Sequence, residues 1–247
     1  SAQELPKNFN QLVQDIEPQL IKWRRHFHEN PELSNREFNT GKYIADYLKT
    51  LGIEVHYPVA KTGVVAILKG GKPGPVVALR ADIDALPVQE RTPVPFASKV
   101  KTEFMGQTVD VMHACGHDVH TSSLLGAARI LNELKDEFEG TIKLIFQPGE
   151  EKLPGGASLM IKEGVLENPK PEHIVGQHVM PIIDAGKVGF RSGMYMASAD
   201  EVYLTVKGKG GHAAMPEMFV DPVVITAHII VALQQIVSRF ASPKVPC

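Results

Sequence analysis

One short stretch of the chain, HACGHD, concentrates side chains that bind metal ions. Cys115 and His117 are two positions apart, so both side chains of an extended loop can reach the same ion. Thiolate and imidazole groups are good ligands for zinc and for the metals close to it. A single cysteine or histidine more often packs in a core or caps a helix, but His113, Asp118 and His120 add to the cluster. We therefore expect a metal site here, and a cysteine nucleophile is the poorer fit beside an acidic pair.

Two adjacent carboxylates, Glu150 and Glu151, follow the apolar run TIKLIFQ and a Pro-Gly turn. Metal-assisted hydrolysis needs one carboxylate that stays free of the metal, takes a proton from the attacking water and returns it to the leaving amine. Neighbouring residues at such a turn point in different directions, so one of the two can bind metal while the other faces the substrate. A solvated acidic turn is the alternative, but a position directly after a buried strand favours a functional role.

Further candidate residues stand at the ends of predicted strands or in turns. His178 follows an apolar run and is a candidate metal ligand, with a buried core histidine as the alternative. Asp82 is expected to orient an imidazole rather than to bind the ion itself, and Arg80 is expected to form an ion pair. His212 lies in the Gly-rich stretch GKGGHAAMP, and most such turns only reverse the chain. A histidine held there could also donate to the developing oxyanion of a carbonyl under attack.

The elements that would position these residues alternate between helices and strands. Some segments repeat apolar residues at helical spacing, and others are short runs rich in Val, Ile and Leu bounded by Gly and Pro. Helices are predicted at 9–28, 37–51, 118–134, 157–161 and 222–239, and strands at 53–57, 64–70, 75–82, 141–147 and 173–179. This order predicts an α/β fold with a mostly parallel sheet layered by helices. The candidate residues then lie where such sheets bind ligands, at the carboxyl ends of their strands.

The pattern changes near residue 193. Val202, Leu204 and Val206 alternate with polar residues, which predicts an antiparallel strand, and a long amphipathic helix is expected to follow. We therefore divide the chain into a metal-binding catalytic domain at 1–192 and the first part of a smaller α+β domain at 193–247.

Composition excludes several classes of partner. The 247 residues carry 26 Lys and Arg against 28 Asp and Glu, a formal net charge of −2, and 43% of them are hydrophobic. No basic surplus is available for nucleic acid or for an anionic membrane, and no apolar run approaches the length of a membrane span. Two cysteines are too few for a disulfide framework. We expect a cytoplasmic protein, with a periplasmic or secreted location as the alternative if a signal peptide has been removed.

Five motifs occur in a fixed order along the chain: LRADIDALP, HACGHDVH, QPGEE, GQHV and GKGGHAAMP. This series resembles the metal-dependent amidohydrolase family that includes hippurate hydrolase, N-acyl-amino-acid amidohydrolases and plant auxin-conjugate hydrolases. The resemblance implies a catalytic domain like that of the dizinc peptidases, with two divalent metal ions. The metal ligands it implies are Cys115, His117, Glu151 and His178. It further implies that Cys115 bridges the two ions and that Glu150 is the general base.

The same resemblance implies that the smaller domain acts as a lid and as the surface of a homodimer, with His212 reaching an active site. Two departures from the family pattern are visible. More distant relatives have His-x-Asp where this chain has Arg80, Ala81 and Asp82. Family members also continue past the lid and supply a further metal-binding histidine, whereas the last histidine here, His228, lies inside a predicted lid helix. We therefore expect the chain to be truncated at its C-terminus.

These observations predict a hydrolase that cleaves the amide bond of N-acyl amino acids with metal-activated water. A dipeptidase or carboxypeptidase would need the same metals and would differ only in its pocket. A non-catalytic metal-binding or dimerisation module is the alternative from a different class. The thiolate ligand suits zinc, and the mixed ligand set also accepts manganese, cobalt or nickel. The expected partners are a small N-acyl amino acid or peptide substrate and a second copy of the chain.

Overall fold

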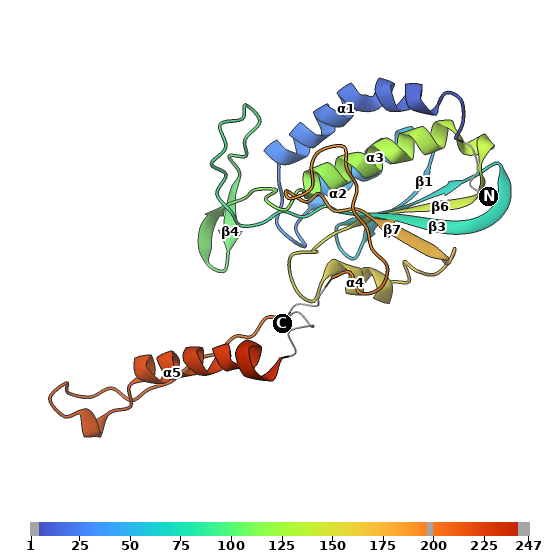
Figure 1. Ribbon diagram of the computed structural model, residues 1–247. Coiled ribbons are helices and arrows are strands. Elements are labelled where there is room, and N and C mark those ends of the chain that lie inside the picture. Colours follow the sequence, from blue (N-terminus) through green and yellow to red (C-terminus); the bar gives the residue numbers. More distant parts are fainter. Residues whose placement is uncertain (1–4, 197–199, 242–247) are drawn as a thin grey trace. The chain divides into compact units, whose positions relative to one another are not determined.

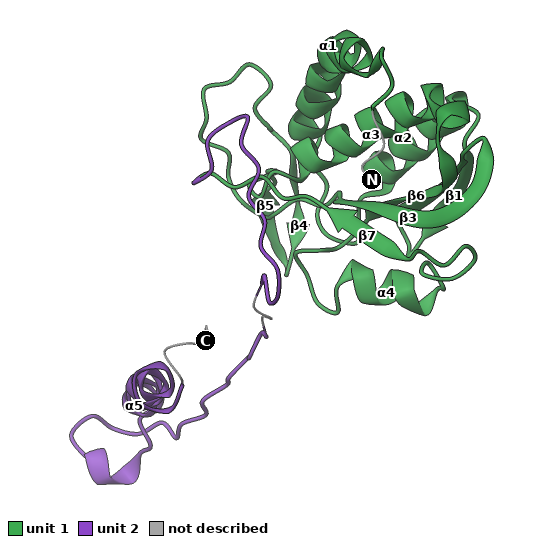
Figure 2. Ribbon diagram, turned by 45° about the vertical axis from the view of Figure 1, so that its right-hand side comes forward, with its two compact units in different colours: residues 1–181 green, residues 182–247 purple. Residues whose placement is uncertain are grey.

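The computed structural model describes residues 5–196 and 200–241 of the chain. The chain separates into two units, residues 1–181 and residues 182–247 (Figure 2). The division drawn from the sequence lies later, at residue 192. The assignment of the second region to a lid or dimerisation domain stays a prediction.

The first unit alternates strands and helices, as the sequence predicts. Its helices are α1 (Phe9–Glu29), α2 (Phe38–Thr50), α3 (His117–Glu133) and α4 (Gly156–Lys162). Its strands are β1 (Glu54–Val59), β2 (Gly63–Lys69), β3 (Lys72–Asp82), β4 (Lys101–Phe104), β5 (Gln107–Asp110), β6 (Glu139–Gln147) and β7 (His173–Gly176). β7 ends earlier than predicted, so His178 lies in the loop after the strand and not at its last position.

The hairpin of β4 and β5 has no counterpart among the predicted elements. Its strands pair in antiparallel register across Met105 and Gly106, which have φ values of 50° and 77°. Positive φ at both central residues is typical of type I′ hairpin turns, which favour Asn-Gly or Asp-Gly. Gly106 was therefore the sequence feature that could have predicted this hairpin. It was a weak one, because Met105 stands where Asn or Asp is usual and the flanking residues are polar.

The main sheet has the strand order β1-β2-β6-β3-β7. β3 runs parallel to β6 and β7, whereas β2 runs antiparallel to β1 and β6. The layered α/β architecture is as predicted, and the sheet is mixed rather than mostly parallel. Chain length explains the antiparallel pairing of β1 with β2, because only Ala60–Thr62 connect them, and a parallel connection needs a crossover of about a dozen residues or more.

Helices cover both faces of this sheet, with α1, α2 and α3 on one side and α4 on the other (Figure 1). Trp23 and Phe146 belong to the larger core, and Met160 belongs to the smaller one under α4. Alternate side chains of a strand point to opposite faces, so a strand covered on both sides is apolar throughout. In β2 the larger core receives Val64, Ala66 and Leu68, and the smaller core receives Val65 and Ile67.

β3 and β6 end at the same edge of the sheet, where Asp82 is in register with Gln147. Because the two strands are parallel, the loops that follow them leave the sheet side by side. The Thr121 hydroxyl of α3 donates to the Asp82 carbonyl at 3.0 Å, which attaches the start of this helix to the end of β3. The HACGHD stretch just before α3 is thereby brought to the same edge as the two glutamates after β6.

In the second unit, α5 (Pro222–Gln235) continues as a π-helical turn over Ile236–Phe240. The Asp221 side chain caps α5 by accepting the Val223 N–H at 2.8 Å. The predicted strand around Val202 is not formed, since within 200–241 this segment has no strand partner and the Val202 side chain is 78% exposed. Alternating apolar residues make one face of a strand, but a strand also needs a neighbour for its backbone groups.

α5 differs from the amphipathic helix that the sequence predicts. None of its described side chains is buried, and apolar ones are exposed around the helix: Val223, Val224, Ile225, Ile230, Val231 and Leu233. By length and composition alone, Pro222–Phe240 is long and apolar enough to cross a membrane. The expectation that no apolar stretch approaches the length of a membrane span was wrong. It considered only unbroken apolar runs, whereas Thr226, His228 and Gln234 interrupt this stretch without adding a charge.

Candidate metal centre

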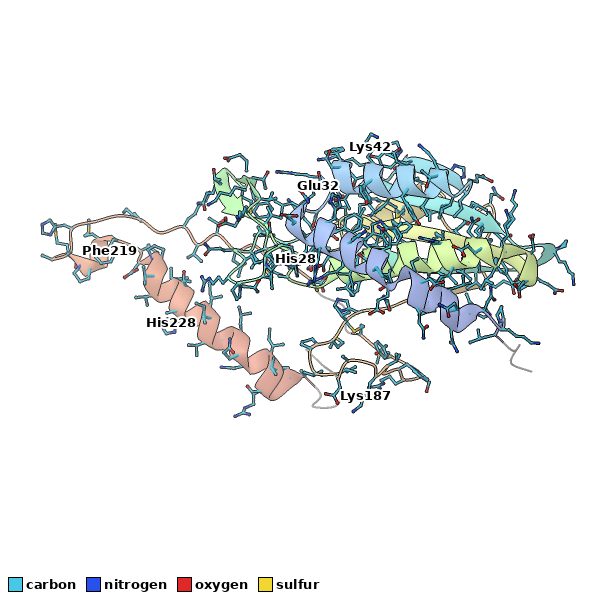
Figure 3. The ribbon with its side chains drawn as sticks, turned by 90° about the horizontal axis from the view of Figure 1, so that it is seen from above. His28, Glu32, Lys42, Lys187, Phe219 and His228 are labelled. Atoms are coloured by element: carbon cyan, nitrogen blue, oxygen red, sulfur yellow. The ribbon has the colours of Figure 1, made fainter. Side chains whose placement is uncertain are left out.

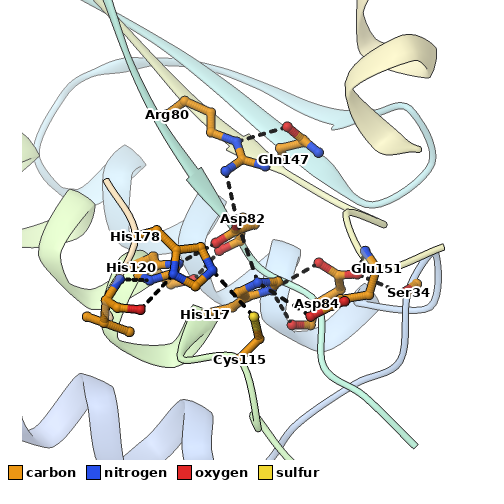
Figure 4. A network of polar contacts seen from close by, with 12 residues as sticks. Ser34, Arg80, Asp82, Asp84, Cys115, His117, His120, Gln147, Glu151 and His178 are labelled. Carbon is orange, nitrogen blue, oxygen red and sulfur yellow. Dashed lines mark hydrogen bonds and ion pairs between the residues drawn. The ribbon is translucent and has the colours of Figure 1, made fainter. Parts of the chain in front are cut away.

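Three predicted ligands from two loops meet at the carboxyl edge of the sheet. Cys115 and His117 come from the start of α3, and His178 comes from the loop after β7 (Figure 4). The Cys115 Sγ atom lies 3.4 Å from His178 Nε2. One ligand atom of each of the three residues lies within 4.8 Å of the other two. This separation allows all three atoms to contact one metal ion.

Hydrogen bonds orient both histidines so that their Nε2 atoms face the cluster. His178 Nδ1 lies 2.7 Å from the Val179 carbonyl, and His117 Nδ1 lies 2.8 Å from the Asp84 carbonyl. A carbonyl only accepts, so Nδ1 carries the proton in each ring and Nε2 keeps its lone pair. Metal-binding histidines are commonly held in this way by a carbonyl or a carboxylate.

Glu150 and Glu151 form a second group with His117, again with ligand atoms within 4.8 Å of one another. In this group Glu151 Oε1 lies 3.8 Å from His117 Nε2. His117 therefore belongs to both groups, the one with Cys115 and the one with the glutamates. Only Nε2 of His117 keeps a lone pair, so His117 would bind one ion, and a second ion would take its ligands from the other residues of the two groups.

Several buried polar atoms of this cluster lack a hydrogen-bond partner among the described residues. They are His117 Nε2, Glu151 Oε1 and Asp84 Oδ1. A buried polar atom left without a partner costs about 1–3 kcal/mol, and more if it is charged. A cation between His117 Nε2 and Glu151 Oε1 would supply the missing interaction of these two atoms, so the residues present fit a metal site.

Asp82 lies beside the cluster and holds a different histidine. Its Oδ1 atom lies 2.6 Å from His120 Nδ1, and its Oδ2 atom accepts from Arg80 at 2.8 Å. Burial opposes the charged carboxylate, but the hydrogen bond to His120 and the charge of Arg80 outweigh it and lower the pKa of Asp82 to about 2. Arg80 thus forms the expected ion pair.

Asp82, His117 and His120 also lie close enough to hold an ion, but His120 has both ring nitrogens in use. His120 Nε2 accepts the Val179 N–H at 2.9 Å, while its Nδ1 faces Asp82. The imidazole that Asp82 orients is therefore His120, which was not among the predicted ligands. Because Val179 follows His178 directly, this chain of bonds also fixes the loop that carries His178.

The protonation of Cys115 depends strongly on its surroundings. Burial, together with the nearby carboxylates of Glu151 and Glu150, raises the pKa of the Cys115 thiol to about 12. A nucleophilic cysteine needs a lowered pKa, so this environment argues against that role. A thiolate at this position requires a positive charge beside it, which a bound metal ion provides.

Asp84 is a functional residue whose role the sequence did not reveal. Its Oδ2 atom accepts the Glu151 N–H at 3.0 Å and the Ser34 hydroxyl at 2.6 Å. Its carbonyl holds His117, as described above. Asp84 therefore positions one candidate ligand from each of two loops. The RADID motif drew attention to both aspartates, but only the fold separates their roles.

Glu37 was missed altogether. Its side chain is fully buried at the start of α2, and it accepts the Gly149 N–H at 2.7 Å, the Asn35 N–H at 2.9 Å and the Thr62 hydroxyl at 2.6 Å. Burial raises the pKa of the Glu37 carboxyl, and these bonds counteract that rise. Gly149 has a φ of 56° and directly precedes Glu150, so Glu37 holds the turn that presents the two glutamates.

His113 and Asp118, which the sequence placed in the same cluster, are not among the grouped ligand atoms. Asp118 accepts from Arg24 at 2.9 Å and pairs with His28 at 2.8 Å, which ties α3 to α1. His113 is buried, and burial lowers its pKa to about 4, so its ring is neutral. Its two ring nitrogens have no partner within the part of the chain that the structure describes.

His212 lies in the second unit, and its ring is fixed by its own turn. Its Nδ1 atom accepts the Ala214 N–H at 3.1 Å, and its side chain is exposed. Nε2 then carries the proton and points away as a donor. This geometry within the turn is the one that a donor to an oxyanion would need.

The fold and the cluster together define a layered α/β protein with a candidate site for two metal ions. Residues 78–246 match the model of peptidase family M20/M25/M40. The chain belongs to this family.

Curated and solved relatives agree with this assignment. An N-acyl-L-amino acid amidohydrolase of Geobacillus stearothermophilus is 42% identical over 97% of this chain and 62% of its own length. A crystal structure of a proposed aminohydrolase from methicillin-resistant Staphylococcus aureus is 40% identical, with a TM-score of 0.76 over 95% of this chain and 60% of that one. A Bacillus subtilis structure described as a dinuclear metal-binding peptidase of the M20 family is 45% identical, with a TM-score of 0.66 over 73% of this chain and 48% of that one. The chain thus spans between 48% and 62% of the length of these relatives.

Replacing Glu37 tests its control over the two glutamates. The change Glu37→Ala is expected to weaken metal binding about 10–100-fold, as is typical when a group that orients metal ligands is lost. Glu37→Gln should weaken it less, because one carbonyl oxygen remains to accept the Gly149 N–H. Competition with a chelator measures the affinity. The exposed Glu54→Ala is the matched control, and equal affinities for Glu37→Ala and Glu54→Ala would contradict the role of Glu37.

Proposed function

We propose that this protein is a metal-dependent amide hydrolase that cleaves N-acyl amino acids and carries two divalent metal ions. One observation carries the proposal: thiol, imidazole and carboxylate ligand atoms gather in two neighbouring groups around His117, and the Nε2 atom of His117 has no other partner among the described residues. The proposed ligands are Cys115, His117, Glu151 and His178. The name of the Geobacillus relative supports an acyl–nitrogen bond as the bond that is cleaved.

The proposed metal ions would polarise the substrate carbonyl and lower the pKa of a bound water molecule. Zinc suits the thiolate of Cys115, and manganese, cobalt or nickel suits the nitrogen and oxygen ligands equally well. The protein contributes the orientation of the ligands. Asp84 holds His117 and the backbone of Glu151, while His120 holds the loop of His178.

Glu150 is the proposed general base and general acid. Burial and the neighbouring carboxylates of Glu151 and Asp82 raise the pKa of Glu150. A raised pKa brings a carboxyl group closer to the working pH, where proton transfer in both directions is most efficient. In the reaction, Glu150 takes a proton from the attacking water and delivers it to the nitrogen of the leaving amino acid.

Matched substitutions of the two glutamates separate base from ligand. Glu150→Gln is expected to lower kcat by about 10²–10⁴, since general acid–base catalysis is lost, while the metal content stays unchanged. Glu151→Gln is expected to lower both the metal content and the rate. Metal analysis of each purified variant and hydrolysis of N-acetyl and N-benzoyl amino acids measure these effects. A Glu150→Gln protein with near-normal activity would refute the role of Glu150.

Metal affinity should rise with pH. In the absence of a cation the Cys115 thiol has a pKa of about 12, and the hydrogen bond to Asp84 and the charge of Asp82 overcome burial and raise the pKa of His117. The Cys115 thiol therefore holds its proton near neutral pH, and His117 holds its proton more tightly than an ordinary histidine does, so metal binding must displace protons from these ligands. Each proton released makes the affinity rise about tenfold per pH unit. Titration calorimetry between about pH 6 and about pH 8 in buffers of different ionisation enthalpy counts the protons, and an affinity that does not change over this range would contradict the argument.

The second unit is proposed to be the lid and the surface of a homodimer. The exposed apolar side chains of α5 support an interface, and the outward N–H of His212 supports a donor to the oxyanion. His212→Ala is expected to lower kcat about 10²–10³-fold with the metal retained. Sedimentation analysis should give a dimer that Val231→Glu dissociates and that the exposed Lys187→Glu does not. A monomer at all concentrations, or an unchanged kcat for His212→Ala, would contradict the corresponding half of this proposal.

A further inference from the structure

A cavity of about 440 Å³ adjoins the candidate metal centre within the first unit. Its wall includes Cys115 and Gly116, so it begins at the cluster of ligands. This volume lies in the range of about 300–1,000 Å³ that is typical of small-molecule sites. Much of the rest of the wall is apolar, with contributions from Val94, Phe96 and Val179.

The outer wall of this cavity is fixed by buried polar contacts. His28, in the last turn of α1 (Figure 3), pairs with Glu90 at 2.9 Å and with Asp118 at 2.8 Å. The Glu90 carboxylate also accepts the Thr92 hydroxyl and the Ser98 N–H. The segment that carries Val94 and Phe96 is thereby tied to α1 and to the start of α3. These contacts hold this wall of the cavity in place.

The charges around the cavity are already paired. Arg24 lies over the ring of Phe96, 5.0 Å from its centre, and donates to Asp118 at 2.9 Å. His28 lies between Asp118 and Glu90. Within the described part of the wall, each cationic side chain therefore has a carboxylate partner, and no cation is left for the carboxylate of an amino acid. The walls favour an uncharged, apolar group.

One polar side chain in this wall is not satisfied. His113 is only 4% exposed, and neither of its ring nitrogens has a hydrogen-bond partner among the described residues. Buried polar side chains are nearly always paired, so an exception needs an explanation. A neutral imidazole offers one donor and one acceptor. A ligand in the cavity with a hydrogen-bonding atom would satisfy it.

We propose that this cavity is the acyl-group subsite, and that it selects an uncharged acyl group larger than acetyl, with His113 hydrogen-bonded to a polar atom on that group. This inference rests on the proposed amide hydrolase function. The acyl half of an N-acyl amino acid carries no charge. The amino-acid half carries a carboxylate, and the described wall has no unpaired cation to bind it. The position beside Cys115 places the acyl carbon next to the metal ligands.

Filling the cavity tests the subsite. The protein is assayed with N-acetyl-, N-hexanoyl- and N-phenylacetyl-alanine, and the ratio of kcat/KM for each larger acyl group to that for acetyl is compared between variants. Val94→Trp is expected to lower this ratio about tenfold or more, as steric exclusion from an apolar pocket does. Val88→Trp is the matched control, because Val88 lies in the same loop, is 40% exposed and does not line the cavity. Equal ratios in the two variants would overturn the proposal.

A pair of substrates tests the contact with His113. N-(4-hydroxyphenylacetyl)-alanine differs from N-phenylacetyl-alanine by one hydroxyl group, and it should be preferred by the wild-type protein. His113→Leu is expected to lower the ratio of kcat/KM for the hydroxylated substrate to that for N-phenylacetyl-alanine about tenfold. The reason is that a site with a buried polar group favours ligands that pair with it. A preference that is unchanged in His113→Leu would overturn the contact.

Binding measurements separate this inference from the proposed function. Calorimetry with the metal-free protein and the same N-acyl-alanines needs no turnover. Binding that strengthens with acyl size and is lost in Val94→Trp supports the subsite, even if no substrate is hydrolysed, and in that case only the proposed function fails. Hydrolysis of all three substrates with no dependence on the cavity variants would support the function and overturn the subsite.

Discussion

The candidate metal centre depends on the parallel pairing of β3 with β6. This pairing places Asp82 opposite Gln147 and sends the loops after both strands to one edge of the sheet. Asp84 lies just beyond β3 and binds the backbone of Glu151 just beyond β6. A shift of one residue between the two strands would turn their side chains to the opposite faces. The ligands would then no longer converge.

Buried carboxylates hold this arrangement in place. Glu37 fixes the turn before the two glutamates, the Asp84 carboxylate fixes the backbone of Glu151, and Asp82 fixes His120. Burying a charge is costly unless hydrogen bonds satisfy it, and each of these carboxylates accepts at least two bonds. These carboxylates hold the loops through several hydrogen bonds each, while the ligand atoms His117 Nε2 and Glu151 Oε1 are left without partners among the described residues.

The ligand cluster is electrostatically incomplete without a cation. Carboxylates crowd around Cys115 and His117 and raise the pKa of both groups. In the metal-free protein the Cys115 thiol keeps its proton, and a divalent ion would replace that proton and offset the negative charge. The adjoining cavity has the opposite character, because its charges are paired with one another and its remaining surface is apolar. A charged reaction centre beside a neutral pocket suits a substrate that has one polar and one apolar end.

The sequence by itself determined the ligand types and the layered α/β class. HACGHD is a local motif, and the strands and helices follow from local periodicity, so neither depends on distant residues. The tertiary structure decided the antiparallel half of the sheet, the unpaired segment near Val202, and the separate roles of Asp82 and Asp84. It alone revealed Glu37, whose bond to Gly149 joins residues 112 positions apart. Contacts of this kind arise from packing, and a single sequence read for spacing and period contains no trace of them.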